Sequence, residues 1–299
     1  MKKKTIALAL LCIGSMTGTY ALSDGNSTIC VNAQVDSSFM RAKELFERGD
    51  YLAAFEGINR TIELYQQSRS DITPEYIDYL ILKGRLLGFL KHYGEAVNQL
   101  LSAFDQHTTI PGISEVTTTQ LYKHIGWHLE RFTAKNEGRD PVQISETSLS
   151  HFREHLSSIK PLQFDIQTGD LLLLAQECYE IALSKDSARF GERHAETAKS
   201  HGLTGWILGV RQHYLEAIEQ HQKALAIRVS LYSESHPDVA RSYGNIGWNY
   251  EQLQNYECAF AYYAASLKIR EEILSPSHPE IAECLESINR IKAANPPKN

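Results

Sequence analysis

The chain has 299 residues and a formal net charge of −6, with 42% hydrophobic residues, 18 glycines and 9 prolines. This composition is typical of a globular protein and excludes a disordered, collagen-like or polybasic chain. Because no run of lysine and arginine occurs after residue 4, we expect neither nucleic acid nor an anionic lipid surface as a general partner.

The first 21 residues are organised like a bacterial secretory signal peptide. Three lysines at positions 2 to 4 precede a short apolar stretch from Thr5 to Gly14, and Thr19-Tyr20-Ala21 places small residues at −3 and −1 of a cleavage site. We expect a cleaved signal and a periplasmic or secreted protein, with an uncleaved anchor as the alternative. Cleavage removes three lysines and no acid, which changes the net charge from −6 to −9. No later stretch is apolar and long enough to span a bilayer, so we expect no stable membrane insertion of the cleaved chain.

After the signal peptide, we expect a flexible segment over residues 22–37 and two helical pairs over residues 38–110. In these pairs Tyr51 and Ala54 recur as Tyr93 and Ala96, 42 residues later. Recurrence at a fixed spacing of this size is typical of stacked helical repeats.

The repeat is irregular between residues 111 and 190. The segment TTTQLYKHIGWHLERF predicts the first helix of a copy, but its partner, LLLLAQECYEIAL, comes 37 residues late. Between them lie a loop from Lys135 to Pro141 and a third amphipathic pattern with apolar residues at spacings of three and four: Leu149, Phe152, Leu156 and Ile159. We therefore expect three helices where other copies have two.

Two copies of 42 residues occupy residues 191–277. His194, His236 and His278 recur at this spacing, and a proline follows the last two at the first position of a predicted helix. We expect these histidines to cap the helices or to form the turns before them. A final helix over residues 278–295 has one apolar side and a polar outer side, as expected of a helix that caps a repeat array.

These residues resemble a tetratricopeptide (TPR) repeat. The first helix of each copy (helix A) carries a glycine, Gly205 or Gly247, and the second (helix B) carries the alanine and aromatic positions. The period of 42 with His-Pro-Asp and His-Pro-Glu between copies is similar to the kinesin-light-chain subfamily. The resemblance implies an all-α, right-handed superhelical solenoid of about twelve helices, with an irregular three-helix insertion near its middle.

All three tryptophans directly follow a glycine at the same phase of the repeat. TPR arrays bind partners mainly in a concave groove lined by the A helices, and the residue after the glycine lies about 100° around the helix from it. We therefore expect the tryptophans to face this groove and to bind a protein or peptide, with polar residues beside them. The predicted groove residues are Trp127, Trp206, Trp248, Asn245, Arg241, Lys199, Glu251 and Gln252.

Two alternatives to this groove remain open. Each tryptophan could instead pack on the next A helix and stiffen the array. In kinesin-light-chain-like repeats an asparagine two residues before the glycine often holds the ligand backbone, and Asn245 matches it. The equivalent residues Leu203 and His124 do not match, so the ligand could be bound differently.

The twelve histidines raise the question of a metal site. His151 to His155 read H-x-x-E-H, the inverted zinc-peptidase motif, and His124 and His128 form another pair one turn apart. No third ligand is evident, and close pairs arise by chance among twelve histidines. His221 occupies an aromatic position of helix B, which favours a core histidine. We expect no catalytic residue, no cofactor and no metal, and we retain a zinc-dependent hydrolase only as an alternative function.

Four cysteines remain after signal cleavage: Cys30, Cys178, Cys258 and Cys284. Cys258 and Cys284 fall on helices expected to be neighbours, so they are the expected pair if a disulfide forms; separate buried thiols are the alternative. Taken together, the sequence predicts an exported, non-enzymatic interaction scaffold. A structural protein that forms homodimers is a further possibility.

Overall fold

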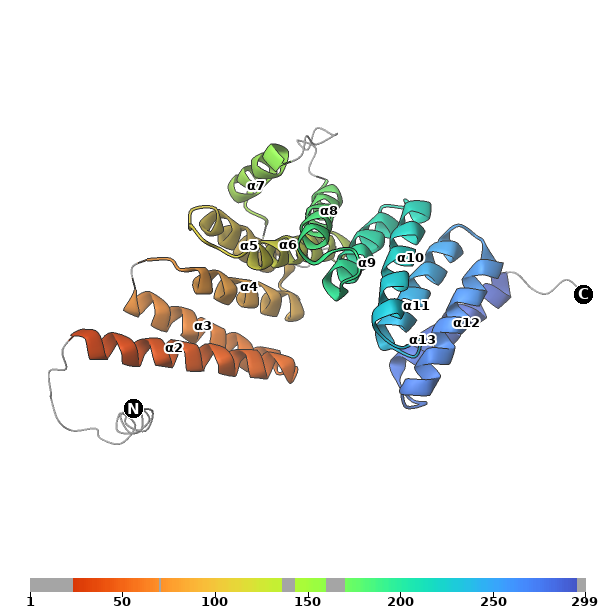
Figure 1. Cartoon of the computed structure of the whole chain (residues 1–299), viewed down its shortest axis with the longest axis horizontal. Helices are drawn as coiled ribbons and strands as arrows, with labels where there is room; N and C mark the ends of the chain where they lie inside the picture. The colour runs from red at the N-terminus through yellow and green to blue at the C-terminus, as the bar shows by residue number, and fades with distance from the viewer. Residues whose placement is uncertain (1–23, 70, 136–142, 160–169, 295–299) are drawn as a thin grey trace, which may run out of the picture. The chain divides into compact units, whose positions relative to one another are not determined.

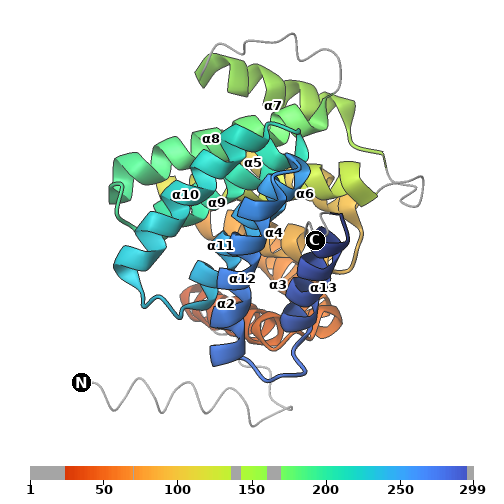
Figure 2. The same cartoon turned by 90° about the vertical axis from the view of Figure 1, so that its right-hand side faces the viewer.

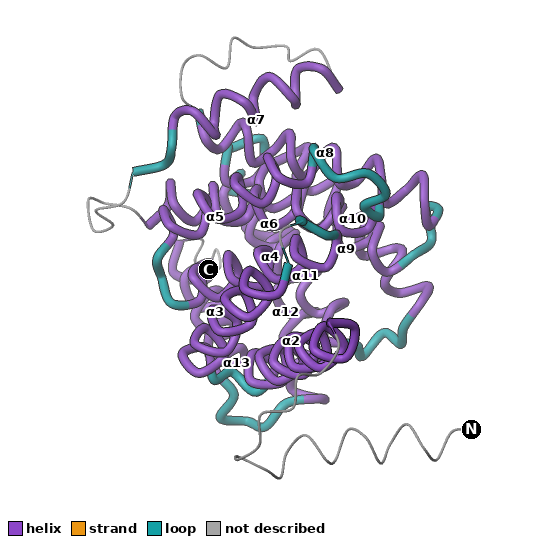
Figure 3. Tube along the Cα trace, turned by 90° about the vertical axis from the view of Figure 1, so that its left-hand side faces the viewer, coloured by secondary structure: helices purple, strands orange, loops and turns teal. Residues whose placement is uncertain are grey.

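The computed structural model describes residues 24–69, 71–135, 143–159 and 170–294. Every secondary-structure element in these residues is a helix, and there are twelve, α2 to α13, which confirms the all-α prediction (Figure 3). The predicted signal peptide lies outside the described residues. None of the twelve helices is long and apolar enough to cross a membrane. The chain forms two compact units, residues 1–71 and 72–299, which are described separately.

The first unit is a pair of packed helices, α2 (Asp24–Glu47) and α3 (Tyr51–Ser68). The Asp50 carboxylate caps α3 by accepting a hydrogen bond from the Ala53 amide at 3.3 Å. The two helices approach closely at Gly57, where an added Cβ would lie 3.3 Å from the Cβ of Ala42. This close contact fixes how the two helices pack.

The helix α2 begins at Asp24, so most of the segment that we expected to be flexible is helical. Three contacts explain its order: Val35 is buried, Thr61 donates a hydrogen bond to Ser38 Oγ at 2.8 Å, and Arg69 donates one to Asn32 at 3.3 Å. The prediction of flexibility over residues 22–37 was therefore wrong for this part, because a long-range packing partner supplies the order that local sequence did not indicate.

The second unit contains alternating A and B helices (Figure 1). The A helices are α4 (Pro74–Phe89), α6 (Glu115–Lys135), α9 (Ala195–Val210), α11 (Pro237–Gln252) and α13 (Pro279–Ala294). The B helices are α5 (Tyr93–His107), α8 (Leu171–Phe190), α10 (Tyr214–Leu231) and α12 (Tyr256–Ile273). The starts of α9, α11 and α13 are 42 residues apart, as the repeat predicts.

Histidines start the last three A helices, as expected. His194 and His236 each use a ring nitrogen to accept a hydrogen bond from the backbone amide two residues later, both at 3.1 Å. Their rings stack on Phe190 and Tyr232 of the preceding B helix, with centroids 4.4 and 4.1 Å apart. The histidines therefore connect one repeat to the next, which confirms their capping role.

In the four A helices that are followed by a B helix, the A helix packs on its B helix through the glycine found in the sequence. An added Cβ at Gly205 would lie 2.9 Å from the His221 ring, and one at Gly247 would lie 3.1 Å from the Tyr263 ring. His221 is fully buried, which confirms that it is a core histidine. The same contact joins the earlier pairs: Gly84 with Leu100, and Gly126 with Tyr179.

The irregular middle of the chain contains the extra helix α7 (Glu146–Ile159). The helix α6 packs along α8, its B helix, whereas α7 packs against α5. Figure 2 shows α7 at the edge of this unit, outside the helix pairs. Phe152 contacts Phe104 edge to face at 4.8 Å, and Leu149 and Leu156 are buried with it. Ile159, expected on the same apolar face, is 46% exposed because it is the last residue of the helix.

The three cysteines with described side chains, Cys178, Cys258 and Cys284, are free thiols. Cys284 Sγ lies 3.9 Å from Ser266 Oγ, and Ser266 comes eight residues after Cys258 on α12. Eight helical residues span about 12 Å, which is beyond the reach of a disulfide. The expected Cys258–Cys284 pair is therefore wrong.

Candidate partner-binding face of the A helices

The residue that follows each close-packing glycine defines one face of the second unit. We call Arg85, Trp127, Trp206 and Trp248, with the residues one turn before and after them, the A-helix face. Each of these glycines contacts the B helix that follows it, so the next residue lies about 100° around the A helix from that contact. All three tryptophans are half-buried, so each keeps part of its ring accessible.

The tryptophans also pack between repeats. The Trp206 and Trp248 rings stack with centroids 5.9 Å apart and an interplanar angle of 30°. Trp248 additionally contacts Tyr214 edge to face at 6.2 Å. Trp127 lies 6.0 Å from Phe89 of the preceding A helix, and the Arg131 guanidinium lies 5.4 Å from the Trp127 ring. The tryptophans thus do pack against neighbouring A helices, as the alternative to partner binding predicts, and this packing fixes the positions of their rings on the A-helix face.

A second glycine on the preceding A helix makes room for each of two tryptophans. An added Cβ at Gly209 would lie 2.8 Å from both Cζ3 of Trp248 and Oδ1 of Asn249, and one at Gly88 would meet the His128 ring first and lie 3.0 Å from Cζ3 of Trp127. We expect Gly209→Ala to displace the rigid Trp248 ring and to destabilise the protein by about 1 to 2 kcal/mol. Thermal or urea unfolding measures this change.

Gly244→Ala is the matched control for this prediction. Gly244 also lies within an A helix, but its nearest neighbour to an added Cβ is Ser266 Oγ at an ordinary 3.5 Å. The alanine should therefore stabilise the helix by up to about 1 kcal/mol through its higher helix propensity. Equal effects of the two substitutions would contradict the close contact between Gly209 and Trp248.

Asn245 lies one turn before Trp248 on α11. Its backbone carbonyl accepts a hydrogen bond from the Asn249 side chain at 2.8 Å. Within the described residues, the Asn245 side-chain amide itself has no hydrogen-bond partner, and the residue is half-buried. An amide with both donor and acceptor capacity beside an aromatic ring is suited to bind a peptide backbone.

Positively charged residues gather on the part of the A-helix face formed by α4, α6 and α9. His124 interacts electrostatically with Arg85 and Lys199; burial, followed by these cations, holds the pKa of His124 well below its usual value. Lys199 lies 4.0 Å from Glu196, and burial lowers the pKa of Lys199. The predicted residue Lys199 therefore shares a surface with Trp127 and Trp206.

The other predicted polar residues differ in their availability. Arg241 forms an ion pair with Asp238 one turn away, and Gln252 is exposed. Glu251 is bound by Arg290 of α13, at 2.6 and 3.0 Å, and accepts a hydrogen bond from Tyr263 at 2.9 Å. Its role is therefore to attach the last helix, and it does not belong to the surface open to a partner.

The H-x-x-E-H segment on α7 is not arranged as a metal centre. His155 Nε2 lies 2.9 Å from the Tyr122 hydroxyl, and the His155 ring packs on Phe104 at 4.8 Å. His151 and Glu154 are exposed. The part of the chain that the structure describes contains no group of three or more histidine, cysteine, aspartate or glutamate side chains placed to hold a metal ion.

A buried ion-pair cluster that the sequence did not predict lies where α6, α8 and α9 meet. Lys123 Nζ lies 2.7 Å from Asp186 and 2.8 Å from Glu196, and Ser200 donates to Asp186 at 2.5 Å. A signal for it exists: Lys123 stands three residues before the close-packing glycine, where the two regular copies have Gly202 and Gly244. A lysine at such a position needs an acidic partner.

Comparison with known proteins identifies the repeats. Residues 208–272 match the family model described as tetratricopeptide repeat. The structure is similar to that of BtubC (BKLC) from P. vanneervenii, with a TM-score of 0.55 and 13% identity, covering 87% of this chain and 84% of that one. The thermophilic TPR protein TTC0263 of Thermus thermophilus has a TM-score of 0.49 at 14% identity, covering 85% of this chain and 99% of that one.

A third similar structure comes from Podosopora anserina and is described as "putative kinesin light chain nearly identical TPR-like repeats". Its TM-score is 0.45 at 13% identity, and the match covers 89% of this chain and 98% of that one. The comparison with curated proteins gave no match. Residues 208–272 therefore match tetratricopeptide repeats, and the chain has a TPR-like all-α fold.

Proposed function

We propose that this protein is an exported, non-enzymatic scaffold that binds a peptide or protein partner on its A-helix face. The observation that carries the proposal is the Trp206–Trp248 stack, which is half-buried and lies one turn from the unpartnered amide of Asn245. Aromatic rings held rigidly at a surface give large contact area at low entropic cost. The TPR fold, common among protein interaction scaffolds, supports the same conclusion.

Polar groups beside the rings would fix the orientation of such a partner. Asn245 would bind its backbone, while Lys199 and the other cations near His124 would bind acidic side chains. Because Arg241 already pairs with Asp238, it would contribute less to binding than Lys199. The net negative charge of the chain argues against nucleic acid as the partner.

A pull-down with residues 22–299 tests this function. The bait is compared with Asn245→Leu, which copies the residue of the preceding repeat, and with a Trp206→Ala/Trp248→Ala double variant. Lysates of the source bacterium and of a host cell are offered, and circular dichroism checks that each variant folds. Loss of such anchoring residues weakens binding by roughly tenfold or more, so we expect a specific partner to be lost from both variants.

Leu215→Ala is the matched control, since Leu215 is 71% exposed on the B helix α10. It should retain the partner fully. Equal capture by all four baits would show that the A-helix face is not the binding surface and would assign the tryptophans to packing alone.

Export is proposed from residues 1–21, whose basic, apolar and small-residue segments fit a signal peptide. The N-terminal sequence of the protein recovered from the periplasm and medium tests it, with Leu22 expected as the first residue. An intact N-terminus on the cell-associated protein would instead indicate an anchor.

A further inference from the structure

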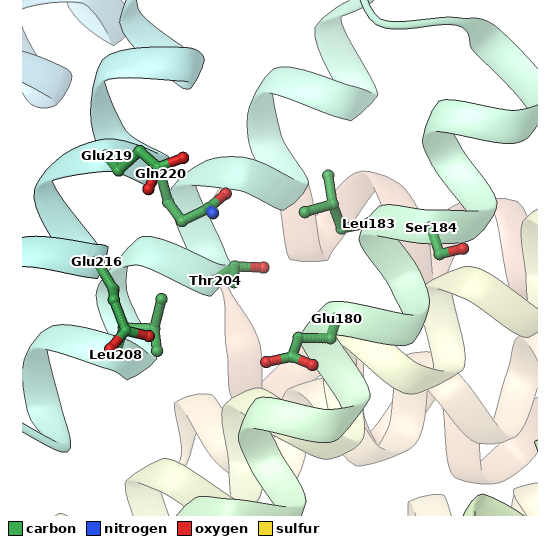
Figure 4. Close-up of a pocket in the computed structure, with 8 residues that line it drawn as sticks. All are labelled: Glu180, Leu183, Ser184, Thr204, Leu208, Glu216, Glu219 and Gln220. Atoms are coloured by element: carbon green, nitrogen blue, oxygen red, sulfur yellow. The ribbon is translucent and has the colours of Figure 1, made fainter. Parts of the chain in front are cut away.

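A cleft of about 360 Å³ opens between the B helices α8 and α10, with α9 at its base (Figure 4). Thr204 and Leu208 of α9 line it, and each is two residues from Trp206. Two residues correspond to about 200° of helix rotation, so the cleft lies on the opposite side of α9 from the A-helix face. It is therefore a surface separate from the proposed partner-binding site.

The walls of this cleft are acidic and its interior is partly apolar. Glu180 of α8 lies across the cleft from Glu216 and Glu219 of α10, and two leucines, Leu183 and Leu208, also line the cleft. Each of these carboxylates already has a partner: Glu180 accepts a hydrogen bond from Gln176 at 2.7 Å, Glu219 pairs with Lys223 at 2.7 Å, and Glu216 lies 3.3 Å from His213. An arginine would compete with these contacts or use the carboxylate lone pairs that they leave. A ligand that suits this lining has an aliphatic stem and a positively charged end.

The hydroxyl of Thr204 is the second feature that indicates a ligand. Thr204 is 3% exposed, and its Oγ1 is buried with no hydrogen-bond partner among the described residues. Figure 4 shows this hydroxyl directed into the space between Glu180 and Leu183. A buried hydroxyl without a partner is destabilising, so a donor that enters the cleft would remove this penalty.

In the next repeat, the positions that correspond to two of the residues lining the cleft carry large aromatic side chains. Between α10 and α12, 42 residues later, Tyr250 replaces Leu208 and Tyr262 replaces Gln220, and the two rings stack 5.4 Å apart. The acidic walls disappear too, because the residues that correspond to Glu216 and Glu219 there are Cys258 and Ala261. The α8–α9–α10 junction therefore differs from the next junction in both the shape and the charge of these positions.

We propose that this cleft binds an arginine side chain of a protein partner. The aliphatic stem would lie between Leu183 and Leu208. The guanidinium carries five donors in a planar fork, so it pairs with carboxylates on both walls and also donates to Thr204 Oγ1. A lysine ammonium has fewer donors and no planar fork, so it binds more weakly.

The test is a titration of the full chain, labelled at leucine and threonine methyl groups, with N-acetyl-L-arginine amide. We expect saturable NMR shifts of the Leu183, Thr204 and Leu208 methyls, at least tenfold weaker binding of the lysine analogue than of the arginine probe, and no binding of the neutral citrulline analogue. Glu216→Gln/Glu219→Gln should weaken arginine binding about tenfold, as expected for the loss of charge-assisted hydrogen bonds.

Two further variants separate a specific site from general attraction to an acidic protein. Thr204→Val, which keeps the shape and removes the hydroxyl, should weaken binding about threefold, as for one lost hydrogen bond. Glu257→Gln/Glu271→Gln removes the same charge from exposed positions of α12 and should change nothing.

Three results would overturn the proposal: no saturable shift with the arginine probe, equal binding of citrulline and arginine, or equal weakening by both glutamate pairs. Saturable binding of spermidine but not of the arginine probe would also overturn it, and would assign the cleft to free amines.

Discussion

Lys123→Met is expected to destabilise the second unit by about 3 to 5 kcal/mol, the typical cost of removing one partner of a buried ion pair. Lys123 is 3% exposed and contacts two carboxylates, one of which, Asp186, is itself only 3% exposed. Without the ammonium, the Asp186 charge would remain buried beside the Ser200 hydroxyl, which is a neutral donor and cannot compensate it. Chemical denaturation at pH 7 measures the change in the free energy of unfolding.

Two controls separate the buried charge from the loss of a side chain. Lys223→Met breaks the exposed pair with Glu219 and should leave the free energy of unfolding nearly unchanged. Lys123→Met/Asp186→Leu removes both buried charges and should regain much of the lost stability, because the uncompensated anion is gone. If the double variant is as unstable as the single one, the packing of Lys123, and not its charge, maintains this junction.

Acid is expected to destabilise the second unit strongly between about pH 6.5 and pH 4. Burial lowers the pKa of both His221 and His128 to about 4. Above pH 6.5 both imidazoles are neutral in the folded and unfolded states, so they contribute no pH dependence. Between the two pKa values the unfolded chain binds more protons, and stability therefore falls as the pH falls. Each histidine contributes about 3 kcal/mol over this window.

His221→Leu tests the contribution of one of these two histidines. Leu100 occupies the same position against its glycine in an earlier repeat, so the substitution has a precedent within the chain. Both ring nitrogens of His221 are buried without a hydrogen-bond partner in the described residues, so leucine should not lower stability at pH 7. We expect a shallower decline of the free energy of unfolding between pH 6.5 and pH 4. An unchanged decline would show that His221 is not the group that titrates.

The regular part of this fold was predictable because its signals are local and repeated. Proline at the first helical position, histidine before it and a glycine within each A helix recur at 42 residues, and each has the role expected of it. The extra helix α7 was predictable for the same reason, since Leu149, Phe152 and Leu156 follow helical spacing.

The features that were missed depend on contacts between distant residues. The order of α2 rests on Asn32 and Ser38 meeting residues of α3 and its C-terminal end, and the buried Lys123 cluster joins three helices. The free state of Cys258 and Cys284 follows from the register of two helices, which spacing along the sequence does not fix. The cleft at Thr204 could not be predicted because its lining residues come from three helices, whose arrangement local sequence does not indicate.

The binding role of the candidate face stays a prediction, and the structure shows only how its residues are placed. The phase of the tryptophans placed them on one side of the A helices, and Asn245 and Lys199 are beside them. Glu251 was assigned to the same surface because neighbouring residues on a helix share a face. Its engagement by Arg290 and Tyr263 could not be anticipated, since it depends on how the last helix returns to the array.

The ion pair between Glu251 and Arg290 occupies the place that a tryptophan and a glycine hold one repeat earlier. Glu251 stands 42 residues after Gly209, and Arg290 stands 42 residues after Trp248. Consecutive A helices are thus joined by an apolar contact inside the array and by an exposed ionic contact at its end. Apolar contacts are insensitive to salt, whereas exposed ion pairs are screened by it. Salt should therefore weaken this one contact of α13, while the apolar packing of Ile288 and Ile291 against Ala259 and Tyr263 of α12 is retained.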